Sequence, residues 1–381
     1  MTRPPRELYD HREQSYVKHL FLTRYLQAGV FKIIQGKSPI FNYVDAFAGP
    51  WRVQDDADHF DSSFAQVISI LDDVRDAFSG KDINLRIRLC ERVTARVELL
   101  RNYAARRPHY DIQIFEGRFE DNLDGIASSC KEGFTFTFID PTGWNFQSSR
   151  IFSFLRKING EFLFNFMSDE INRHVSFDRV AESFGRFLAE ENWRERFSAA
   201  PINYTNEQKV LYILKQRMRE ERIATFFPHM TISHPRQNRV RMRLILGTNS
   251  PVAVKLFRDT QRHVLQQEMK VRHEITAKES GQPRLFSASD LAQLDMYKVG
   301  IENEDTCEAA RLKLVSILEE SPGIQYKMIV PKLLEDVELR APELNKLMMQ
   351  WREEGIIAFR IPPRKRKPQD NTAIYIQQKG S

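Results

Sequence analysis

Residues 40 to 167 alternate between short β-rich runs and longer helical runs, and this alternation limits the fold more than any other feature of the sequence. The β-rich runs cover residues 40–47, 85–90, 111–115, 134–139 and 161–167. Helical periodicity fills the stretches between them and also precedes them over residues 12–34. The alternation predicts a Rossmann-like α/β domain, with a mostly parallel sheet and helices on both faces.

The sheet is predicted to end in an antiparallel edge hairpin. Residues 171–222 are helical and charged without a strand signal, which indicates a helical insertion. Two apolar β-rich runs follow, over residues 226–233 and 240–247, and only a short HPRQN loop separates them. A helix is predicted over residues 253–267 after the second run.

The last part of the chain has a different pattern. Its Gly, Pro and Ser content and an acidic IENED stretch predict a linker over residues 281–306, between an α/β domain of residues 1–280 and a C-terminal domain of residues 307–381. Three helical runs and then two β-rich runs joined by PPRKRKPQDN match a winged helix-turn-helix; the runs cover residues 308–319, 326–335, 342–354, 356–361 and 373–376. Such modules bind nucleic acid or dock proteins, and both interpretations stay open.

Composition excludes two classes of protein. With 41% hydrophobic residues and a mean hydropathy of -0.48, the chain is too apolar for disorder and too polar for a membrane span. The first residues, MTRPPRELYDHREQ, contain no apolar stretch of a secretory signal, and three cysteines make no disulfide framework. We therefore expect a cytoplasmic protein.

Basic residues gather in two places. Between residues 214 and 279 there are 14 Lys or Arg against 6 Asp or Glu, and the hairpin contributes Arg236, Arg239, Arg241 and Arg243. The second place is the run Arg364, Lys365, Arg366 and Lys367 between the last two β-rich runs. Both groups are candidates for contact with nucleic-acid phosphates, although a solvated strand or loop explains the hairpin group equally well.

Acidic residues follow three of the predicted strands. They are Asp45, Glu91 and Asp140, and parallel strands bring their carboxyl ends to one sheet edge, where open α/β sheets bind ligands. Gly49 allows the backbone to approach a ligand closely after the first strand. Glu91 could accept hydrogen bonds from the ribose of an adenosine-type cofactor, or pair with a neighbouring arginine on a solvated face. After the third strand, Phe119 could lie against an adenine ring.

These motifs resemble the class I S-adenosylmethionine-dependent methyltransferases, which have a strand ending in Asp-x-Phe-Ala-Gly, an acid after the second strand and Asp-Pro after the fourth. The segments YLQAG, YVDAFAGP, FIDPTGW and LILGTNSPVAVKLF look like the three-Cys-motif partner proteins within that superfamily. This is a bacterial and phage-linked family named for an associated radical-S-adenosylmethionine-like protein. The likeness covers most of residues 12–265.

The resemblance implies roles for particular residues. It implies that S-adenosylmethionine binds with its methionine and ribose lined by Asp45, Phe47, Ala48 and Gly49, with Glu91 on the ribose and with Gly117, Arg118 and Phe119 around the adenine. It implies that Asp140 and Pro141 accept hydrogen bonds from a substrate amine, and that Trp144 stacks on a flipped base. It also implies two partners, a nucleic acid and a three-cysteine-motif radical enzyme.

Two departures from the family pattern leave two functions open. The final glycine of Phe-Ala-Gly-Pro-Gly is Trp51 here, and the loop Asp140-Pro-Thr-Gly lacks the second proline and the immediate aromatic residue of amino-methyltransferases. One function is methyl transfer to a nucleobase amine. The other is a non-catalytic, nucleic-acid-binding partner of the radical enzyme, in DNA repair or phage defence, with Trp51 filling the pocket.

Four other polar residues have simpler interpretations. Lys18 could reach the same sheet edge as Asp140, although an exposed helix lysine is the commoner case. Asn165 could face the pocket, although an asparagine satisfied by backbone groups is the simpler interpretation. Asp169 and Glu170 could form a carboxylate pair or, more simply, cap the helix that follows. The nine histidines are scattered, without a close pair beside a carboxylate, so we predict no metal site.

Overall fold

The structure is a computed structural model that describes residues 6–36, 38–49, 53–55, 58–175, 177–237, 239–280 and 298–377. The chain forms two compact units, Met1–Asn249 and Ser250–Ser381. The division therefore comes earlier than the predicted boundary after residue 280. Helix α10 (Pro251–Ser280) packs on α13 (Tyr326–Asp336) and so belongs to the second unit. Most of the predicted linker, residues 281–297, lies outside the described residues.

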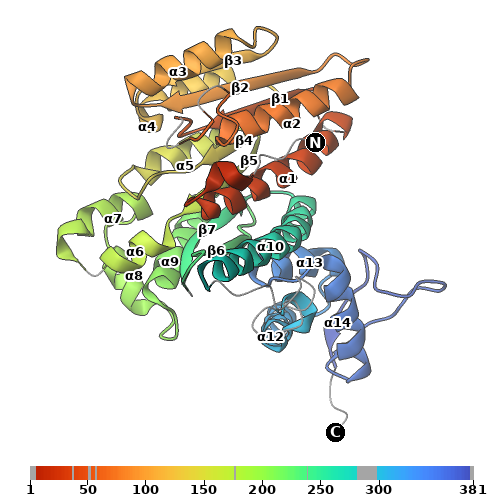
Figure 1. The fold of residues 1–381 in the computed structure, drawn as a ribbon. Helices are drawn as coiled ribbons and strands as arrows, with labels where there is room; N and C mark the ends of the chain where they lie inside the picture. Colours follow the sequence, from red (N-terminus) through yellow and green to blue (C-terminus); the bar gives the residue numbers. More distant parts are fainter. Residues whose placement is uncertain are drawn as a thin grey trace. The chain divides into compact units, whose positions relative to one another are not determined.

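The first unit is built on a seven-stranded sheet with the order β3-β2-β1-β4-β5-β7-β6 (Figure 1). Strands β1 to β5 run parallel, β7 is antiparallel to β5, and β6 pairs with β7 as the edge of a hairpin. This confirms the class I methyltransferase-like fold. The strands are β1 Ile40–Asp45, β2 Asn84–Glu91, β3 Asp111–Glu116, β4 Phe134–Ile139, β5 Gly160–Phe166, β6 His229–Ser233 and β7 Val240–Gly247.

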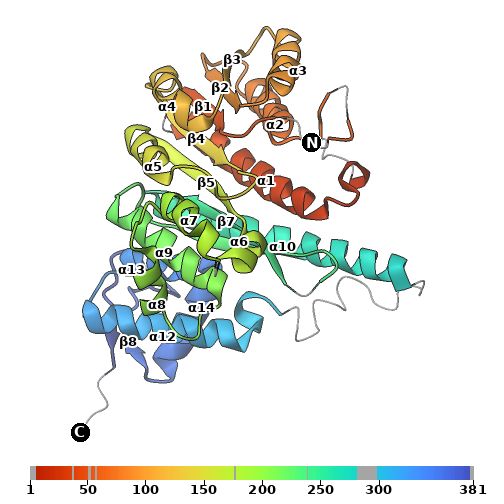
Figure 2. The same ribbon diagram turned by 90° about the vertical axis from the view of Figure 1, so that its left-hand side faces the viewer.

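Helices cover both faces of the sheet, as predicted. Figure 2 shows α1 (Glu13–Gly36), α2 (Ser63–Ala77) and α3 (Thr94–Ala105) on one side, and α4 (Phe119–Ser129) and α5 (Ser148–Lys157) on the other. All six residues of β4, FTFTFI, are buried, because a central parallel strand is covered on both faces. This rigid centre holds the strand ends from which the candidate site projects.

The strand register brings the carboxyl ends of four strands to one edge. Asp45, the last residue of β1, is paired with Leu89 of β2 on one side and with Phe138 of β4 on the other. Glu91 and Asp140 thus each lie two residues further along their own chain segments. Since the strand order reverses between β1 and β4, where the chain winds outward in both directions, this edge is the usual ligand crevice of an open α/β sheet.

The helical insertion predicted over residues 171–222 is present. It consists of α6 Ser168–His174, η2 Asp178–Val180, α7 Ala181–Leu188, α8 Trp193–Ala199 and α9 Asn206–Glu220. Phe184, Phe187 and Trp193 are buried and join the core on the α5 side of the sheet. The insertion therefore extends the hydrophobic core of the first unit.

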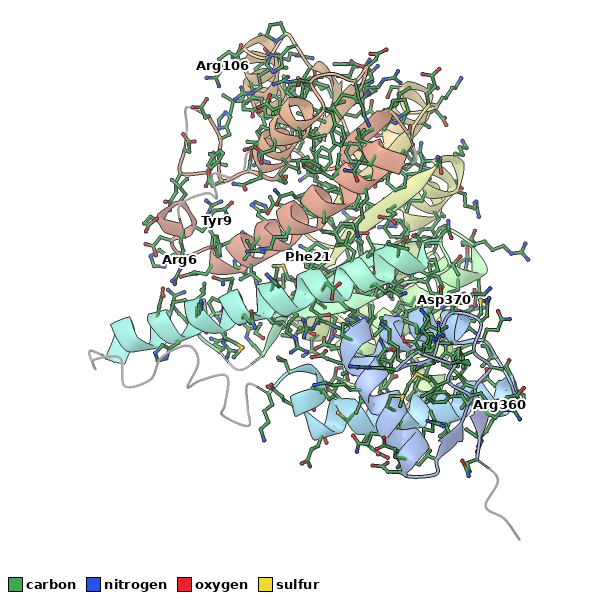
Figure 3. The ribbon with its side chains drawn as sticks, turned by 90° about the vertical axis from the view of Figure 1, so that its right-hand side faces the viewer. Arg6, Tyr9, Phe21, Arg106, Arg360 and Asp370 are labelled. Carbon is green, nitrogen blue, oxygen red and sulfur yellow. The ribbon has the colours of Figure 1, made fainter. Side chains whose placement is uncertain are left out.

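A short helix, η1 (Arg6–Tyr9), is held against the start of α1. The Tyr9 hydroxyl and His19 Nδ1 are 2.9 Å apart; Figure 3 labels Tyr9 in η1 and Phe21 in α1. Burial lowers the pKa of His19 well below its usual value, so the ring is neutral at neutral pH. This contact fixes the α1 turn that also carries Lys18.

The second unit contains α10, η4 Gly300–Glu302, α12 Glu304–Glu320, α13 and α14 Ala341–Glu353. The buried Arg258 of α10 donates to the carbonyl oxygens of Leu334 and Glu335 in the last turn of α13, at 2.6 and 2.8 Å. Burial lowers the pKa of this guanidinium to about 10. The bonds satisfy carbonyl groups that the end of a helix leaves without partners.

The last two strands are shorter than predicted. Strands β8 (Ile357–Ala358) and β9 (Tyr375–Ile376) pair over only two residues each, and the proline-rich segment between them does not extend the ladder. Figure 3 labels Arg360 and Asp370 on either side of the basic run. Three helices and a small hairpin are present as predicted, and the winged-helix assignment stays a prediction. Within the described ranges, no helix is long and apolar enough to span a membrane.

Candidate functional site

Asp45 at the end of β1 is fully buried and shapes the turn after the strand. Its carboxylate accepts hydrogen bonds from the Tyr43 hydroxyl at 3.0 Å, the Phe47 backbone N–H at 3.2 Å and the Ser63 hydroxyl at 2.7 Å. Burial raises the pKa of Asp45 to about 6, although these three donors oppose the shift. Because Ser63 is the first residue of α2, its hydrogen bond to Asp45 joins the end of β1 to the start of α2.

The turn carries three of the predicted cofactor residues. Phe47 is half-buried and packs near Phe119 and Phe146. Ala48 is buried, and its backbone N–H donates to the carbonyl oxygen of Cys90 at 2.9 Å. Gly49 comes next, and Trp51 lies outside the described residues. Its predicted role as a filler of the pocket therefore stays a prediction.

Gly49 and Glu91 lie against each other. A Cβ atom on Gly49 would overlap the Glu91 carboxylate and would lie 2.9 Å from Cδ of Arg96. Glu91 Oε1 accepts from the Val93 N–H at 2.7 Å, and Oε2 is 3.9 Å from Arg96 Nη1. Glu91 is thus buried beside a glycine backbone and also close to an arginine, so both of its predicted environments occur together.

The turn after β3 places its three predicted residues differently. Gly117 has φ +115°, a backbone conformation that favours glycine, and its N–H bonds the Glu91 carbonyl at 2.9 Å. Arg118 is exposed and precedes α4. Phe119 is buried, with its ring 5.5 Å from Phe154 in an edge-on contact, so it belongs to the core.

A cavity of about 450 Å³ opens beside Arg118. Its lining residues are Arg118, Glu120, Asp121, Asn145, Phe146, Gln147, Arg150 and Arg186. Glu120 is buried and accepts from the Gln147 backbone N–H at 3.3 Å. Glu120 and Phe146 are not among the predicted site residues; Glu120 stands directly after Phe119, the predicted adenine contact, in an acidic segment.

Asp140 follows β4 and lies between two side chains from distant parts of the chain. Lys18 Nζ of α1 forms an ion pair with Asp140 Oδ2, and Asn165 Nδ2 at the end of β5 donates to Asp140 Oδ1 at 2.6 Å. The side chains of Lys18 and Asp140 are 9% and 21% exposed. Lys18 therefore reaches this sheet edge, which is one of its two predicted positions, and the commoner interpretation as a solvent-exposed helix lysine is wrong.

Asn165 also differs from the prediction. Its Nδ2 donates to a carboxylate rather than to the backbone, and its Oδ1 is buried without a hydrogen-bond partner in the described part of the chain. Ser168 Oγ, three residues later, is likewise buried and unpaired among the described residues. Buried polar atoms without partners are rare and indicate a missing ligand, water or functional strain.

Pro141 and Trp144 occupy the loop after Asp140. Pro141 is buried, whereas Trp144 donates its Nε1–H to the Ser183 hydroxyl at 3.1 Å and stacks on Phe184 at 5.0 Å between ring centroids. The His174 ring also contacts Trp144, with 5.3 Å between the two ring centroids. Trp144 thus packs against the helical insertion, and one of its faces is already covered.

The hairpin arginines are paired within the first unit. Arg239 and Arg241 form ion pairs with the buried Asp169, and Arg236 Nη2 lies 3.3 Å from Glu13 Oε1. The Asp169 carboxylate therefore pairs with two arginines of the hairpin and does not form the α6 cap that was predicted for it. Arg243 is buried and bonds Glu207 at 2.7 Å.

The second basic group is arranged differently. Arg364, Lys365, Arg366 and Lys367 are all exposed, and Arg364 has φ +64° in a tight turn. They project from the second unit.

Over the described ranges, no group of three or more His, Cys, Asp or Glu side chains is arranged to hold a metal ion.

No model of a known protein family matches the sequence, and no curated protein sequence matches it. Similar solved structures include a Staphylococcus aureus protein assigned as a caffeoyl-CoA O-methyltransferase, with 13% identity, a TM-score of 0.28 and coverage of 58% of this chain and 82% of that one. Another is the Escherichia coli protein yhhF, assigned as a methyltransferase, with 11% identity, a TM-score of 0.25 and coverage of 59% and 86%.

A third similar structure is a loganic acid methyltransferase with SAH, with 10% identity, a TM-score of 0.28 and coverage of 73% of this chain and 91% of that one. At these TM-scores the likenesses support no inference about activity, substrate or cofactor. The fold class rests instead on the strand order and strand directions of this chain.

Proposed function

We propose that the first unit is an S-adenosylmethionine-dependent methyltransferase whose substrate is an exocyclic amine of a nucleobase in DNA or RNA. One observation carries the proposal. Asp140 lies at the carboxyl edge of this sheet and is partly exposed, and the buried Lys18 ammonium and the buried Asn165 amide hold its carboxylate in place. A carboxylate fixed in this way is suited to position a substrate group.

The residues at the neighbouring strand ends suit the cofactor in their chemistry. The Glu91 carboxylate beside the Gly49 backbone can accept hydrogen bonds from ribose hydroxyls. The cavity lined by Phe146 and Glu120 offers an aromatic ring and a carboxylate to a flat heterocycle with an amino group. These features fit an adenosine cofactor at the end of β2 and β3.

The chain's own residues then orient the substrate. When bound, S-adenosylmethionine supplies a methyl carbon on a positive sulfur; the nitrogen–carbon bond forms as the carbon–sulfur bond breaks, and the sulfur keeps the electron pair. Asp140 accepts a hydrogen bond from the amine and so directs the nitrogen lone pair. The methylated nitrogen afterwards loses one proton to water.

A nucleic-acid substrate is supported by the exposed basic run of the second unit. Arg364, Lys365, Arg366 and Lys367 have the charge and exposure that phosphate contacts need. Within the first unit, the hairpin arginines support the proposal less, because Arg243 is buried and Arg239 and Arg241 are paired with Asp169.

Calorimetry with S-adenosylmethionine and S-adenosylhomocysteine tests the cofactor. We expect micromolar binding of both, and loss of at least about tenfold in affinity in Glu91→Ala, since hydrogen bonds to a charged group are removed. An exposed control, Glu98→Ala, should bind as the wild type does. Absence of binding at millimolar ligand, with and without DNA, contradicts the proposal.

Transfer of a labelled methyl group to DNA or RNA oligonucleotides tests the reaction. Asp140→Ala should abolish transfer while retaining binding of S-adenosylhomocysteine. Unchanged transfer in that variant would show that Asp140 does not position the substrate.

A second function is favoured by the same ion pair. Lys18 already neutralises Asp140, as a non-catalytic scaffold would allow. On this alternative the protein is a nucleic-acid-binding partner of a three-cysteine-motif radical enzyme, as its resemblance to the three-Cys-motif partner proteins implies. Co-purification with such an enzyme, with no cofactor binding by this chain alone, would favour the alternative.

A further inference from the structure

The environment of Asp140 contains more polar groups than a single carboxylate needs. Lys18 occupies Oδ2 and Asn165 occupies Oδ1, so the carboxylate cannot rotate freely. Each carboxylate oxygen has two lone pairs, which leaves one free acceptor site on each. The free sites have fixed directions because both partners are buried.

Asn165 brings a further acceptor to the same place. Its Oδ1 is bonded to the same carbon as the Nδ2 that reaches Asp140, so this oxygen lies within a few ångströms of the carboxylate. Oδ1 is buried and has no hydrogen-bond partner in the described ranges. A buried amide oxygen without a partner is costly, and a ligand N–H would remove that cost.

We propose that Asn165 and Lys18 adapt this site to a neutral primary amine, an inference that rests on the proposed methyltransferase function. Asn165 Oδ1 and Asp140 accept the two N–H bonds of the amine. Lys18 is a positioning residue that holds Asp140 and balances its charge. The substrate class is therefore an uncharged –NH₂ group, such as the exocyclic amine of adenine or cytosine.

The two neighbours of Asp140 exclude two other substrate classes. A hydroxyl group donates only one hydrogen bond, so a hydroxyl held by Asp140 would leave the buried Asn165 Oδ1 without a partner. An alkylammonium group, such as a protonated lysine side chain, would bring a second cation beside Lys18, and like charges at close range repel strongly. A neutral amine avoids both costs.

Sinefungin tests this inference without a known substrate. This analogue of S-adenosylmethionine carries an amine in place of the methyl group, so its amine reports on the position where methyl transfer occurs. The readout is the ratio of the dissociation constants of S-adenosylhomocysteine and sinefungin, measured by calorimetry. The parts that the two ligands share cancel in this ratio.

The two substitutions should move the ratio in opposite directions. Asn165→Leu removes an acceptor and should lower the preference for sinefungin about tenfold, as expected for the loss of one hydrogen bond from the neutral amine. Lys18→Met removes a competing cation and should raise that preference about tenfold, whereas Lys18→Arg should leave it unchanged. Asn159→Leu at the opposite end of the sheet and Lys32→Met further along α1 are matched controls.

Proton release supplies a second readout. If the site takes a neutral amine, wild-type protein should release about one proton on binding sinefungin below the solution pKa of its amine. The number of protons follows from the binding enthalpy in buffers of different ionisation enthalpy. Lys18→Met should bind the charged amine and release none.

The outcomes separate the two proposals. Failure of S-adenosylhomocysteine to bind wild-type protein overturns the methyltransferase function itself. Normal binding of S-adenosylhomocysteine, with a preference ratio that neither Asn165→Leu nor Lys18→Met changes, overturns only the role of these two residues. Equal proton release in wild type and Lys18→Met also overturns it.

Discussion

The ends of β1 and β4 each carry a carboxylate, and the two are held in opposite ways. Asp45 is fully buried among neutral donors, the Tyr43 hydroxyl, the Ser63 hydroxyl and a backbone N–H. Asp140 is partly exposed and is held by a cation and an amide that come from other elements. The first arrangement fixes a turn, and the second leaves free acceptor sites toward solvent. Position at a strand end therefore does not by itself define a functional acid; its partners do.

The largest expected effect concerns the ion pair at β4. Asp140→Leu alone should lower the free energy of unfolding by about 3 kcal/mol, because it leaves the buried Lys18 ammonium unpaired. Lys18→Met alone should lower it less, because the Asp140 carboxylate that it leaves unpaired is partly exposed. The double variant should recover most of the loss. Urea denaturation of the four proteins measures the coupling. Additive losses would mean that Lys18 and Asp140 do not interact, and Asp140 would then not be held by a cation as Asp45 is held by neutral donors.

The next effect concerns pH and the β1 end. Asp45 has a folded-state pKa of about 6, above its ordinary value of 3.8, so the folded protein binds this proton more tightly than the unfolded chain does. Its contribution to stability is therefore present below pH 4 and is lost as the pH rises through 6, by about 2 to 3 kcal/mol.

Asp45→Asn isolates that contribution. The difference in unfolding free energy between wild type and Asp45→Asn should shift against the wild type between pH 4 and pH 7. A difference that does not change with pH would contradict the raised pKa of Asp45. The same measurement on Asp140→Asn compares the carboxylate at the end of β4 with the one at the end of β1.

A third, smaller effect concerns the turn after β1, where Gly49 lies against the Glu91 carboxylate. Gly49→Ala places a methyl group where the Glu91 carboxylate lies, so that carboxylate has to move. We expect about tenfold weaker binding of S-adenosylhomocysteine, which corresponds to about 1.4 kcal/mol. Gly143→Ala is a suitable control, because nothing lies within 4 Å of a Cβ atom there. Equal binding in both variants would remove Gly49 from the cofactor site.

The sequence predicted the sheet well and placed the acids of the candidate site at one edge of it. The regular alternation indicated the strands, and β4 has the predicted bounds because all six of its residues, FTFTFI, are aromatic or β-branched. The acids at strand ends were found because parallel strands share an edge. The sequence left two positions open for Lys18, an exposed helix face and this sheet edge, because it does not show that its partner Asp140 lies 122 residues away in the chain. Trp144 was assigned to a base because a sequence does not show which side of a loop a ring packs on.

The smallest expected effect separates a structural Asn165 from a functional one. Asn165→Leu removes the hydrogen bond to Asp140, which lowers stability, and it also removes a buried oxygen without a partner, which raises stability. These terms oppose each other, so the free energy of unfolding should stay within about 1 kcal/mol of the wild-type value. Thermal and urea denaturation measure it. A loss of about 3 kcal/mol would instead make Asn165 a structural link between β4 and β5, equivalent to Asp45 at β1. A near-neutral result would mean that its unpaired oxygen is retained for a reason other than stability, as expected of an acceptor kept for a substrate.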